Sequence, residues 1–457
     1  MSVLKADICV IGAGSGGLSV AAGAVQLGLS VVLIERGEMG GDCLNRGCVP
    51  SKSLLAMAKK GMTFHQAHQH VQQAITTIAP HDSVERFEKM GCTVVRQPAR
   101  FIDRNTLECG DGQTIRARYI VIAAGSRPHI PDIKGLDADK VLTNETLFTL
   151  SEKPKHLAII GGGPMGVEMA QAHTKMGCRV TLVTCGEILP RDDRDCVDSV
   201  RKALQADGVT IHENTVVYKA IFGKTPSLKT SAGIIEATHI LVATGRTPNV
   251  DTLNLNAANI KYDGGGIIVN KRLQTNHSHI YALGDIIKDG PQFTHAAGYQ
   301  AGIIIRNICF RLPAKTDYTS LPWVTYTSPE LAHVGMTETE AERRFSRHKI
   351  RVLTKNIADN DRAVTEGIDN RMIKIVGKTN GTILGVSIVG DHAGEMLPLW
   401  ILALQKTMTM KDIAGLILPY PTLSEIHKSV ASEWYKDALF SDKTRFLVRW
   451  LQKLPSF

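Results

Sequence analysis

The chain has 457 residues, of which 43% are hydrophobic and 21% charged, and its formal net charge is +9. This length predicts two to four domains, and the composition is ordinary for a globular protein. No run of about 18 apolar residues occurs, so no membrane span is expected, and Lys5 and Asp7 lead into a strand rather than a signal peptide. An odd count of nine cysteines without an export signal excludes a disulfide scaffold and predicts a reducing, cytoplasmic compartment. No nucleic-acid-binding motif accompanies the positive charge, which we assign to solvated surface and phosphate-bearing cofactors.

The first elements in chain order form a complete dinucleotide-binding unit. They are a buried strand at Ala6–Ile11, a glycine-rich loop, a helix at Leu18–Leu27 and a second strand at Ser30–Ile34. In the loop, Gly12 permits the tight turn, Gly14 lets the backbone approach a pyrophosphate, and Gly17 lets helix and strand pack closely. Glu35 follows the second strand, where an acid can accept hydrogen bonds from a ribose diol.

A dithiol segment, residues 40–52, comes directly after this unit. Cys43 and Cys48 are five positions apart, which in a regular helix separates them by roughly 7.5 Å along the axis. A disulfide needs Cα atoms about 4.4–6.8 Å apart, so we expect a strained loop that enters a helix near Pro50. Strained disulfides are easily reduced, as a catalytic disulfide must be. The same spacing is also compatible with two unpaired thiols that form no disulfide.

The region after the dithiol segment predicts a helix and then a β-meander. His65 and His68 could share a helix face, but no carboxylate or cysteine completes a ligand set, so no metal site is predicted. The meander strands are expected at Cys92–Val95, Arg100–Ile102, Thr106–Cys109, Thr114–Ile115 and Tyr119–Ile122, with a hairpin turn at Asp111-Gly112. The last strand ends at Ala124 and Gly125.

A second dinucleotide-binding unit repeats the architecture of the first. A strand at His156–Ile160 runs into Gly161, Gly163 and Gly166, a helix through Glu168, and a strand at Arg179–Thr184. Two nucleotide sites and a dithiol imply an electron relay from one nucleotide through the other to sulfur. Thr184 and Arg191, rather than an acid, follow the last strand, which favours NADPH over NADH without deciding between them.

The remaining chain adds strand-end motifs and a separate domain. Strands end at Gly245 and at Gly284-Asp285, a helix runs from Thr294 to Cys309, and residues 321–457 form an α+β domain without a glycine fingerprint. The basic, aromatic tail Lys443–Lys453 is expected to pack on the protein, with a membrane surface as the alternative. The predicted fold is α/β, with two Rossmann-like domains and a C-terminal α+β domain. Its expected divisions are 1–150, 151–250, 251–320 and 321–457.

These motifs together resemble the flavoprotein disulfide reductases, which include dihydrolipoamide dehydrogenase, glutathione reductase and mercuric reductase. The resemblance covers nearly the whole chain, including Ala243–Arg246, Ala282–Asp285, Thr327–Glu330 and Pro421-Thr422 with Glu425. It implies FAD in the first unit, bound by the residues Gly12, Gly14, Gly17, Glu35, Gly41, Asp42, Lys52, Ala124, Gly125, Gly284 and Asp285. It implies NAD(P)H in the second unit, bound by Gly161, Gly163, Gly166, Thr184 and Gly245.

The resemblance also implies roles and a homodimer formed through the C-terminal domain. Cys48 would be the thiolate beside the flavin, Cys43 the exchanging thiol, and Lys52 and Glu168 a pair close to the flavin. Each active site would be completed by the partner's Pro421 turn, which carries the residues Tyr420 and Glu425. The implied acceptor is a small-molecule disulfide or thiol-reactive species, with no nucleic-acid partner.

Three departures from the family pattern, and the residue at position 22, bear on the substrate. Tyr420 stands where the family usually has a histidine base, and an unperturbed tyrosine, with a pKa of about 10, is a poor base near pH 7. No cysteine follows Cys309, although mercuric reductases carry a C-terminal pair. Asp42 replaces a threonine, and its charge is expected to raise the pKa of Cys43. Ala22, at the position of a substrate-binding arginine, argues against glutathione. A redox-sensing flavoprotein and a diaphorase or quinone reductase remain alternatives.

Overall fold

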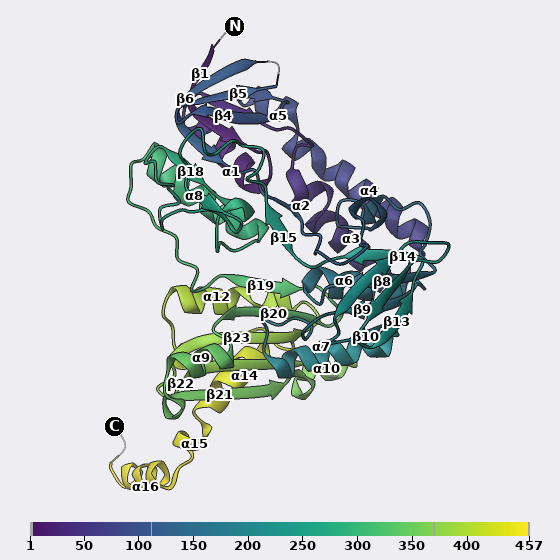
Figure 1. Ribbon diagram of the computed structural model, residues 1–457. Helices are drawn as coiled ribbons and strands as arrows, with labels where there is room; N and C mark the ends of the chain where they lie inside the picture. The colour runs from purple at the N-terminus through teal and green to yellow at the C-terminus, as the bar shows by residue number, and fades with distance from the viewer. Residues whose placement is uncertain (1–2, 111, 369–370, 456–457) are drawn as a thin grey trace. The chain divides into compact units, whose positions relative to one another are not determined.

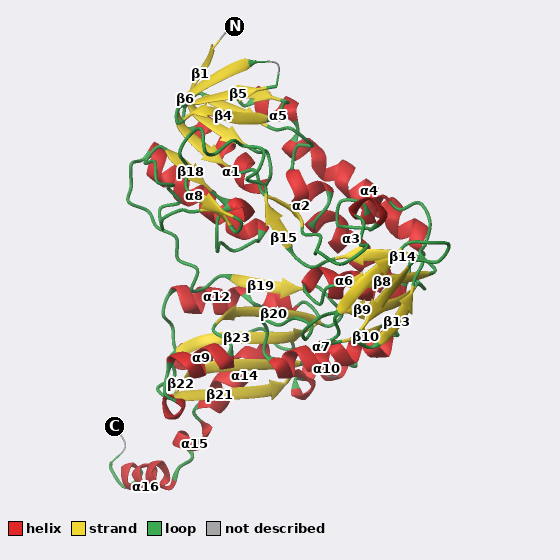
Figure 2. Ribbon diagram, in the orientation of Figure 1, coloured by secondary structure: helices red, strands yellow, loops and turns green. Residues whose placement is uncertain are grey.

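The computed structural model describes residues 3–110, 112–368 and 371–455, which form two compact units (Figure 1). The first unit comprises Met1–Glu187 and Gly208–Asp317, and the second comprises Ile188–Asp207 and Tyr318–Phe457. Helices and strands alternate through the first unit, as expected for the α/β class (Figure 2). The finer four-part division by bound nucleotide stays a prediction.

The first sheet of unit 1 is built around the N-terminal strand. Its order is β3-β2-β1-β6-β5-β4, with β18 also paired to β6. Strands β1 (Val3–Ile11), β2 (Val31–Ile34), β3 (Thr93–Val95), β6 (Gln113–Ile122) and β18 (Ile280–Ala282) are parallel. All four residues of β2 are buried, which explains its unbroken apolar sequence. Helices α1 (Ser15–Gln26) and α8 (Thr294–Cys309) pack against each other in this unit.

The predicted meander is partly wrong. Strands β4 (Ala99–Asp103), β5 (Thr106–Cys109) and β6 pair antiparallel in sequence order. However, β3 pairs parallel with β2, and Thr114–Ile115 and Tyr119–Ile122 are parts of the single strand β6. The polar residues Arg116 and Arg118 alternate with buried positions inside this strand, so they do not interrupt it. Residue 111 of the expected Asp111-Gly112 turn lies outside the described residues.

The second sheet of unit 1 carries the second glycine fingerprint. Its parallel strands are β10 (Thr210–His212), β9 (Arg179–Val183), β8 (His156–Ile160) and β14 (His239–Val242), in that order. Helix α6 (Pro164–Lys175) follows β8. A three-stranded sheet contains β11 (Val217–Ile221), β12 (Ser227–Thr230) and β13 (Gly233–Glu236). Smaller pairs are β7 (Ser126–Pro128) with β15 (Arg246–Pro248), and β16 (Tyr262–Asp263) with β17 (Gly266–Ile267).

The dithiol segment lies in a helical layer of unit 1. This layer contains α2 (Gly41–Asn45), α3 (Cys48–Lys59), α4 (Phe64–Ile78) and, further along the chain, α5 (Val84–Lys89). Helix α4 begins with a capping box, in which Thr63 accepts from the Gln66 backbone and Gln66 accepts from the Thr63 backbone. Helix α3 packs on both α4 and α6, so the dithiol segment is attached to the helix of the second fingerprint.

Unit 2 is an α+β domain around a five-stranded antiparallel sheet. The strand order is β19 (Pro322–Thr325), β20 (Glu330–Gly335), β23 (Ile383–Gly390), β22 (Met372–Lys378) and β21 (Ile350–Asn356). Its helices are α9 (Glu338–Arg344), α10 (Asp361–Glu366), α11 (Ala393–Met396), α12 (Pro398–Gln405), α13 (Met410–Ala414), α14 (Glu425–Trp434), α15 (Lys436–Leu439) and α16 (Asp442–Leu451). Trp400 and Trp434 fill its core.

One helix within residues 151–250, the expected second nucleotide domain, belongs to unit 2. Helix α7 (Arg194–Asp207) packs on β20 and β23. Lys374 of β22, only 4% exposed, lies 2.9 Å from Asp195 and 2.7 Å from Glu338, measured between Nζ and carboxylate oxygens. Burial opposes the charge of Lys374, but hydrogen bonds to Glu338 and Asp195 outweigh it and raise the lysine pKa. Ion pairing, which local sequence patterns do not reveal, therefore attaches α7 to unit 2.

The tail does not pack as expected. Among the described residues of α16, none is buried. In Figure 1, α15 and α16 extend away from the five-stranded sheet beyond the end of α14.

Candidate active site

The two cysteines of the dithiol segment are brought together by a break between two helices. Cys43 lies in α2, Cys48 is the first residue of α3, and Gly47 separates the helices. A Cβ atom at Gly47 would lie 2.8 Å from the Asp42 carbonyl oxygen, so the return of the chain onto α2 requires glycine. Both cysteines are free thiols, and their side chains form a hydrogen bond with each other. The pair is thus positioned to interconvert between dithiol and disulfide.

The two sulfurs have opposite acidities. The hydrogen bond from Cys43 lowers the pKa of Cys48 to about 6 against opposing burial, with help from the Thr294 hydroxyl and the Lys52 charge. The Thr294 Oγ1 atom lies 3.4 Å from the Cys48 sulfur. The same hydrogen bond, together with burial, raises the pKa of Cys43. Cys48 is therefore the thiolate of the pair at neutral pH, and Cys43 retains its proton.

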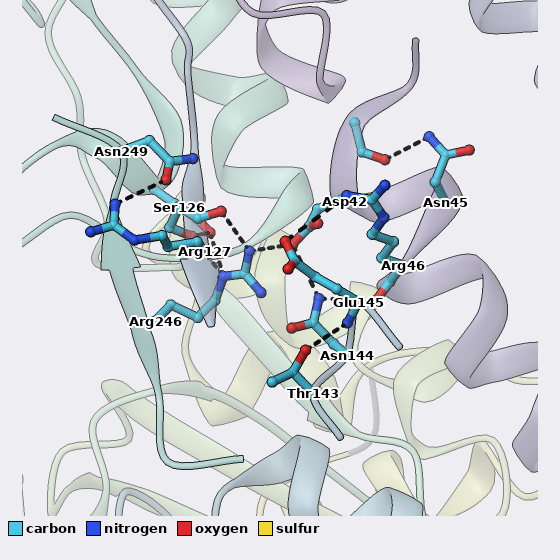
Figure 3. Close-up of polar contacts among 12 residues, drawn as sticks. Asp42, Asn45, Arg46, Ser126, Arg127, Thr143, Asn144, Glu145, Arg246 and Asn249 are labelled. Atoms are coloured by element: carbon cyan, nitrogen blue, oxygen red, sulfur yellow. Dashed lines mark hydrogen bonds and ion pairs between the residues drawn. The ribbon is translucent and has the colours of Figure 1, made fainter. Parts of the chain in front are cut away.

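The expected cause of the Cys43 shift is wrong, although its direction is right. Asp42 is not among the main causes of the raised pKa of Cys43. Its carboxylate pairs with the Arg246 guanidinium and accepts from the Asn144 amide at 3.4 Å (Figure 3). Arg246 also donates to the Ser126 hydroxyl at 2.6 Å, and Ser126 donates to Asp285 at 2.7 Å. The charge of Asp42 is thus balanced by a cation rather than directed at the thiol.

Asp285 belongs to the same network. Burial raises its pKa against the opposing hydrogen bond from Ser126 and the charge of Arg246, whose Nε lies 3.4 Å away. The network therefore connects two residues predicted to bind FAD, Asp42 and Asp285, through Arg246 and Ser126, which the sequence analysis did not single out as site residues. The position of Arg246 directly after Gly245, in a strand-end motif, was the available signal.

An ion pair between a partly exposed lysine and a buried glutamate joins helix α3, which begins at Cys48, to helix α6 of the second fingerprint. Lys52 of α3 donates to Glu168 of α6 with an Nζ–Oε2 distance of 2.8 Å. The Glu168 side chain is 3% exposed and the Lys52 side chain 36% exposed. The structure brings these two predicted residues together, and the lysine charge also acts on Cys48.

The first glycine loop is shaped to receive a pyrophosphate. A Cβ atom at Gly12 would lie 2.3 Å from the Ala123 carbonyl oxygen, and one at Gly17 would lie 1.9 Å from the Gly12 oxygen. By contrast, nothing lies within 4 Å of a Cβ atom at Gly14, the N-cap of α1. Glu35 accepts from the Ala13 and Gly37 backbone amides, both at 2.7 Å. Close packing around an open helix N-terminus fits the diphosphate of FAD.

The dithiol segment directly adjoins this loop. The Gly40 amide donates to the Ala13 carbonyl at 2.9 Å, and a Cβ atom at Gly41 would lie 2.8 Å from the Gly14 Cα atom. Gly125 and Gly284, also predicted to bind FAD, have φ values of 63° and 75°, and the Gly284 amide donates to Gln300 at 2.7 Å. Ala124, beside Gly125, accepts from Asn249 at 2.9 Å.

The second loop repeats the packing of the first. A Cβ atom at Gly161 would lie 2.3 Å from the Ala243 oxygen, one at Gly166 would lie 2.0 Å from the Gly161 oxygen, and Gly163 is open. Gly245, with φ of 129°, is also open. Thr184 is only 9% exposed and packs beside Gly162, so it is a poor phosphate ligand. The structure therefore does not support Thr184 as a determinant of NADPH preference.

Tyr420 lies in unit 2 with its own acid partner. Its hydroxyl donates to Asp361 at 2.8 Å, and this hydrogen bond and the carboxylate charge raise the pKa of Tyr420. Asn360 donates to the Thr422 carbonyl at 3.1 Å, and Glu425 accepts from the Thr422 amide at 3.5 Å. The Tyr420 turn is thus held from both sides, and its hydroxyl acts as a donor rather than a base.

The histidines of α4 have local partners. His68 is buried and its Nδ1 lies 3.0 Å from the Phe64 carbonyl, while His65 contacts Gln69 at 3.2 Å. No group of three metal-ligating side chains was found within the described part of the chain.

A redox dithiol held between two dinucleotide-binding folds defines the class of enzymes that exchange electrons between a pyridine nucleotide and a disulfide. The chain belongs to the pyridine nucleotide-disulphide oxidoreductase family. The model of that family matches residues 6–301, and the model of its dimerisation domain matches residues 321–431.

Named relatives extend over nearly the whole chain. A mercuric reductase of Lysinibacillus sphaericus is 32% identical over 459 residues, covering 94% of this chain and 83% of that protein. A dihydrolipoyl dehydrogenase of Geobacillus stearothermophilus is 31% identical, covering 94% and 96%. The Cu(II) complex of the HOCl-induced flavoprotein disulfide reductase RclA from Escherichia coli superposes with a TM-score of 0.89 at 27% identity, covering 95% and 100%.

These comparisons confirm the fold class and the family resemblance. The chain is an FAD-dependent pyridine nucleotide-disulphide oxidoreductase with a dimerisation domain, and NAD(P)H is its second cofactor. No helix among the described residues is long and apolar enough to cross a membrane.

Proposed function

We propose that the Cys43–Cys48 pair carries electrons from NAD(P)H and FAD to a disulfide or thiol-reactive acceptor. The observation that carries this proposal is the hydrogen-bonded pair of thiols adjoining the first glycine loop. FAD, when bound, supplies hydride acceptance from the nicotinamide and two-electron transfer to the sulfur pair. The residues predicted to hold it are those of the Gly12–Gly17 loop, Glu35 and the Arg246–Asp285 network.

The steps at sulfur follow from the opposite acidities of the two thiols. Cys43 loses its proton and attacks one sulfur of the acceptor disulfide, releasing the other half as a thiolate that takes up a proton. The Cys48 thiolate then attacks the Cys43 sulfur, releases the second half of the acceptor and leaves a Cys43–Cys48 disulfide. Two electrons have then passed to the acceptor.

Lys52 and Tyr420 act as a cation and a hydrogen-bond donor in this proposal. Lys52, oriented by Glu168, stabilises negative charge beside Cys48. In a homodimer built through the dimerisation domain, the Tyr420 hydroxyl would turn from Asp361 to donate to the departing thiolate of the partner's sulfur pair. The free state of all nine cysteines is consistent with a reducing, cytoplasmic location.

The test is an anaerobic titration with NADPH and NADH, followed by turnover with lipoamide, mercuric ion and quinones. Reduction should produce a long-wavelength band from thiolate Cys48 beside oxidised flavin. Cys43→Ser should still accept hydride but lose disulfide or mercuric turnover, while Cys185→Ser, at an exposed cysteine, should behave as the wild type. Undiminished acceptor turnover in Cys43→Ser would refute the role of the dithiol.

A redox-sensing flavoprotein is the second candidate, favoured by the Tyr420–Asp361 contact. The usual base is replaced by a hydroxyl whose pKa is raised, which slows thiol exchange. Turnover of a small disulfide at roughly 1–10³ s⁻¹ would exclude this candidate. A diaphorase or quinone reductase would instead keep full activity in the Cys43→Ser/Cys48→Ser double variant.

A further inference from the structure

The C-terminal helix α16 is amphipathic, and its apolar face is exposed. The exposed fractions are 72% for Phe446, 54% for Trp450 and 51% for Leu447. These residues share one face with further exposed apolar side chains, because residues three, four and seven positions apart lie on the same side of a helix. The exposed apolar residues of α16 are Phe446, Leu447, Val448, Trp450 and Leu451, and the exposed Leu454 lies just past the end of the helix.

The opposite face of α16 is basic. Arg445 and Arg449 are one helical turn apart on this face. Lys443 lies on the apolar side, three and four positions before Phe446 and Leu447, and Lys453 follows the end of the helix. Asp442 is the one acidic residue from 442 to 454. Asp442 lies 3.6 Å from Arg445, measured between Oδ1 and Nη1, so only one of the four cations has a carboxylate partner within this segment. A short helix with aromatic and leucine side chains on one face and arginines on the other is typical of helices that lie in a membrane interface.

We propose that α16 binds the surface of an anionic lipid bilayer. Its ten residues span about 15 Å, too short to cross a bilayer but long enough to lie in the interface. The apolar face would enter the boundary between headgroups and acyl chains, and the arginines and lysines would contact lipid phosphates.

Two observations favour a lipid surface over a second copy of the chain. The match to the dimerisation-domain family ends at residue 431, before α16 begins at Asp442. In addition, pairing α16 with its own copy would bring two strongly basic helices together, whereas an anionic surface neutralises their charge.

The test is co-sedimentation of the full-length FAD-bound protein with vesicles of phosphatidylcholine, alone or mixed with phosphatidylglycerol. We expect binding to the mixed vesicles that weakens as the salt concentration rises toward about 1 M, where the screening length falls to about 3 Å. Each cationic residue near such a surface contributes about fivefold in affinity, so Arg445→Glu/Arg449→Glu should weaken binding at least tenfold. Phe446→Glu/Trp450→Glu should do the same through the apolar face.

The controls separate a lipid contact from misfolding and from a subunit contact. Ile234→Glu changes a similarly exposed residue, 65% exposed, on β13 and should bind as the wild type. Trp400 and Trp434 are buried and Trp323 is held by a hydrogen bond to Asp192, so a blue shift of tryptophan fluorescence on vesicles should be lost in Trp450→Phe while binding persists. Equal sedimentation with and without phosphatidylglycerol, or none at all, would overturn the proposal. The proposal would also be overturned if the wild type does not bind vesicles and Trp450→Glu converts a dimer to a monomer, because α16 would then be a subunit contact.

Discussion

The acidity of Cys48 should depend on the thiol of Cys43. Replacing Cys43 by alanine removes the hydrogen bond that is the largest cause of the lowered Cys48 pKa. A hydrogen bond to a charged group contributes about 1.5–3 kcal/mol, but a thiol is a weak donor, so we take about 1.4 kcal/mol. This free energy corresponds to about one pKa unit. The pKa of Cys48 should therefore rise from about 6 to about 7.

The measurement is the pH dependence of Cys48 alkylation by iodoacetamide in the reduced protein, read by mass spectrometry of the Cys48 peptide. Only the thiolate reacts, so the rate falls as the pH drops through the thiol pKa. In the wild type this fall should be centred near pH 6, and in Cys43→Ala near pH 7.

Thr294 provides an independent comparison for this prediction. Thr294→Val removes the second hydrogen-bond donor to Cys48 and should shift the midpoint upward by less than Cys43→Ala, whereas Thr294→Ser keeps the hydroxyl and should leave it in place. A midpoint unchanged in Cys43→Ala would show that the Lys52 charge and the start of α3, rather than the paired thiol, govern the acidity of Cys48.

Three further predictions concern charged groups. Lys52→Met removes the cation beside the nearly buried Glu168 and should lower the free energy of unfolding by about 2 kcal/mol, less than for a fully buried pair. The measurement is the fall in the thermal unfolding midpoint, and adding Glu168→Gln should recover much of the lost stability. Arg246→Met leaves two carboxylates without their shared cation and should increase the FAD dissociation constant at least tenfold, measured by the fluorescence of released flavin; unchanged retention would contradict this role. Lys374→Met should destabilise unit 2 by about 3–5 kcal/mol, whereas the more exposed pair in Lys355→Met should cost about 1 kcal/mol or less.

The glycine fingerprints were predictable because their physics is local. A strand, a tight turn and a helix N-terminus each have a sequence pattern that is only a few residues long. Gly12 and Gly161 adopt φ values of 106° and 123°, which residues other than glycine rarely take. The break at Gly47 was similarly predictable, since no regular helix brings Cys43 and Cys48 together.

The contacts that tune the site were not predictable in the same way. Arg246 reaches Asp42 across 204 positions of sequence, and Thr294 reaches Cys48 across 246. Helix α7 likewise has an ordinary amphipathic sequence, which does not reveal that it packs on β20 and β23 or that Asp195 pairs with Lys374 of β22. Side-chain partners of this kind depend on tertiary packing, which a single sequence does not encode by spacing.

The charge arrangement constrains which acceptors suit this site. Cys43 must attack, yet its proton is retained by the neighbouring Cys48 thiolate and by burial, and the Tyr420 hydroxyl is already bound to the Asp361 carboxylate. In the proposed homodimer, a partner tyrosine with a raised pKa would not remove that proton at neutral pH, so thiolate formation at Cys43 would be the unfavourable step. An acceptor that binds sulfur tightly enough to displace the proton, such as a soft metal ion, avoids this cost, because metal binding itself deprotonates a thiol. An ordinary disulfide cannot displace the Cys43 proton, so its reduction carries this cost. The replacement of a basic histidine by an acid-bound tyrosine therefore favours thiol-reactive acceptors over simple disulfides.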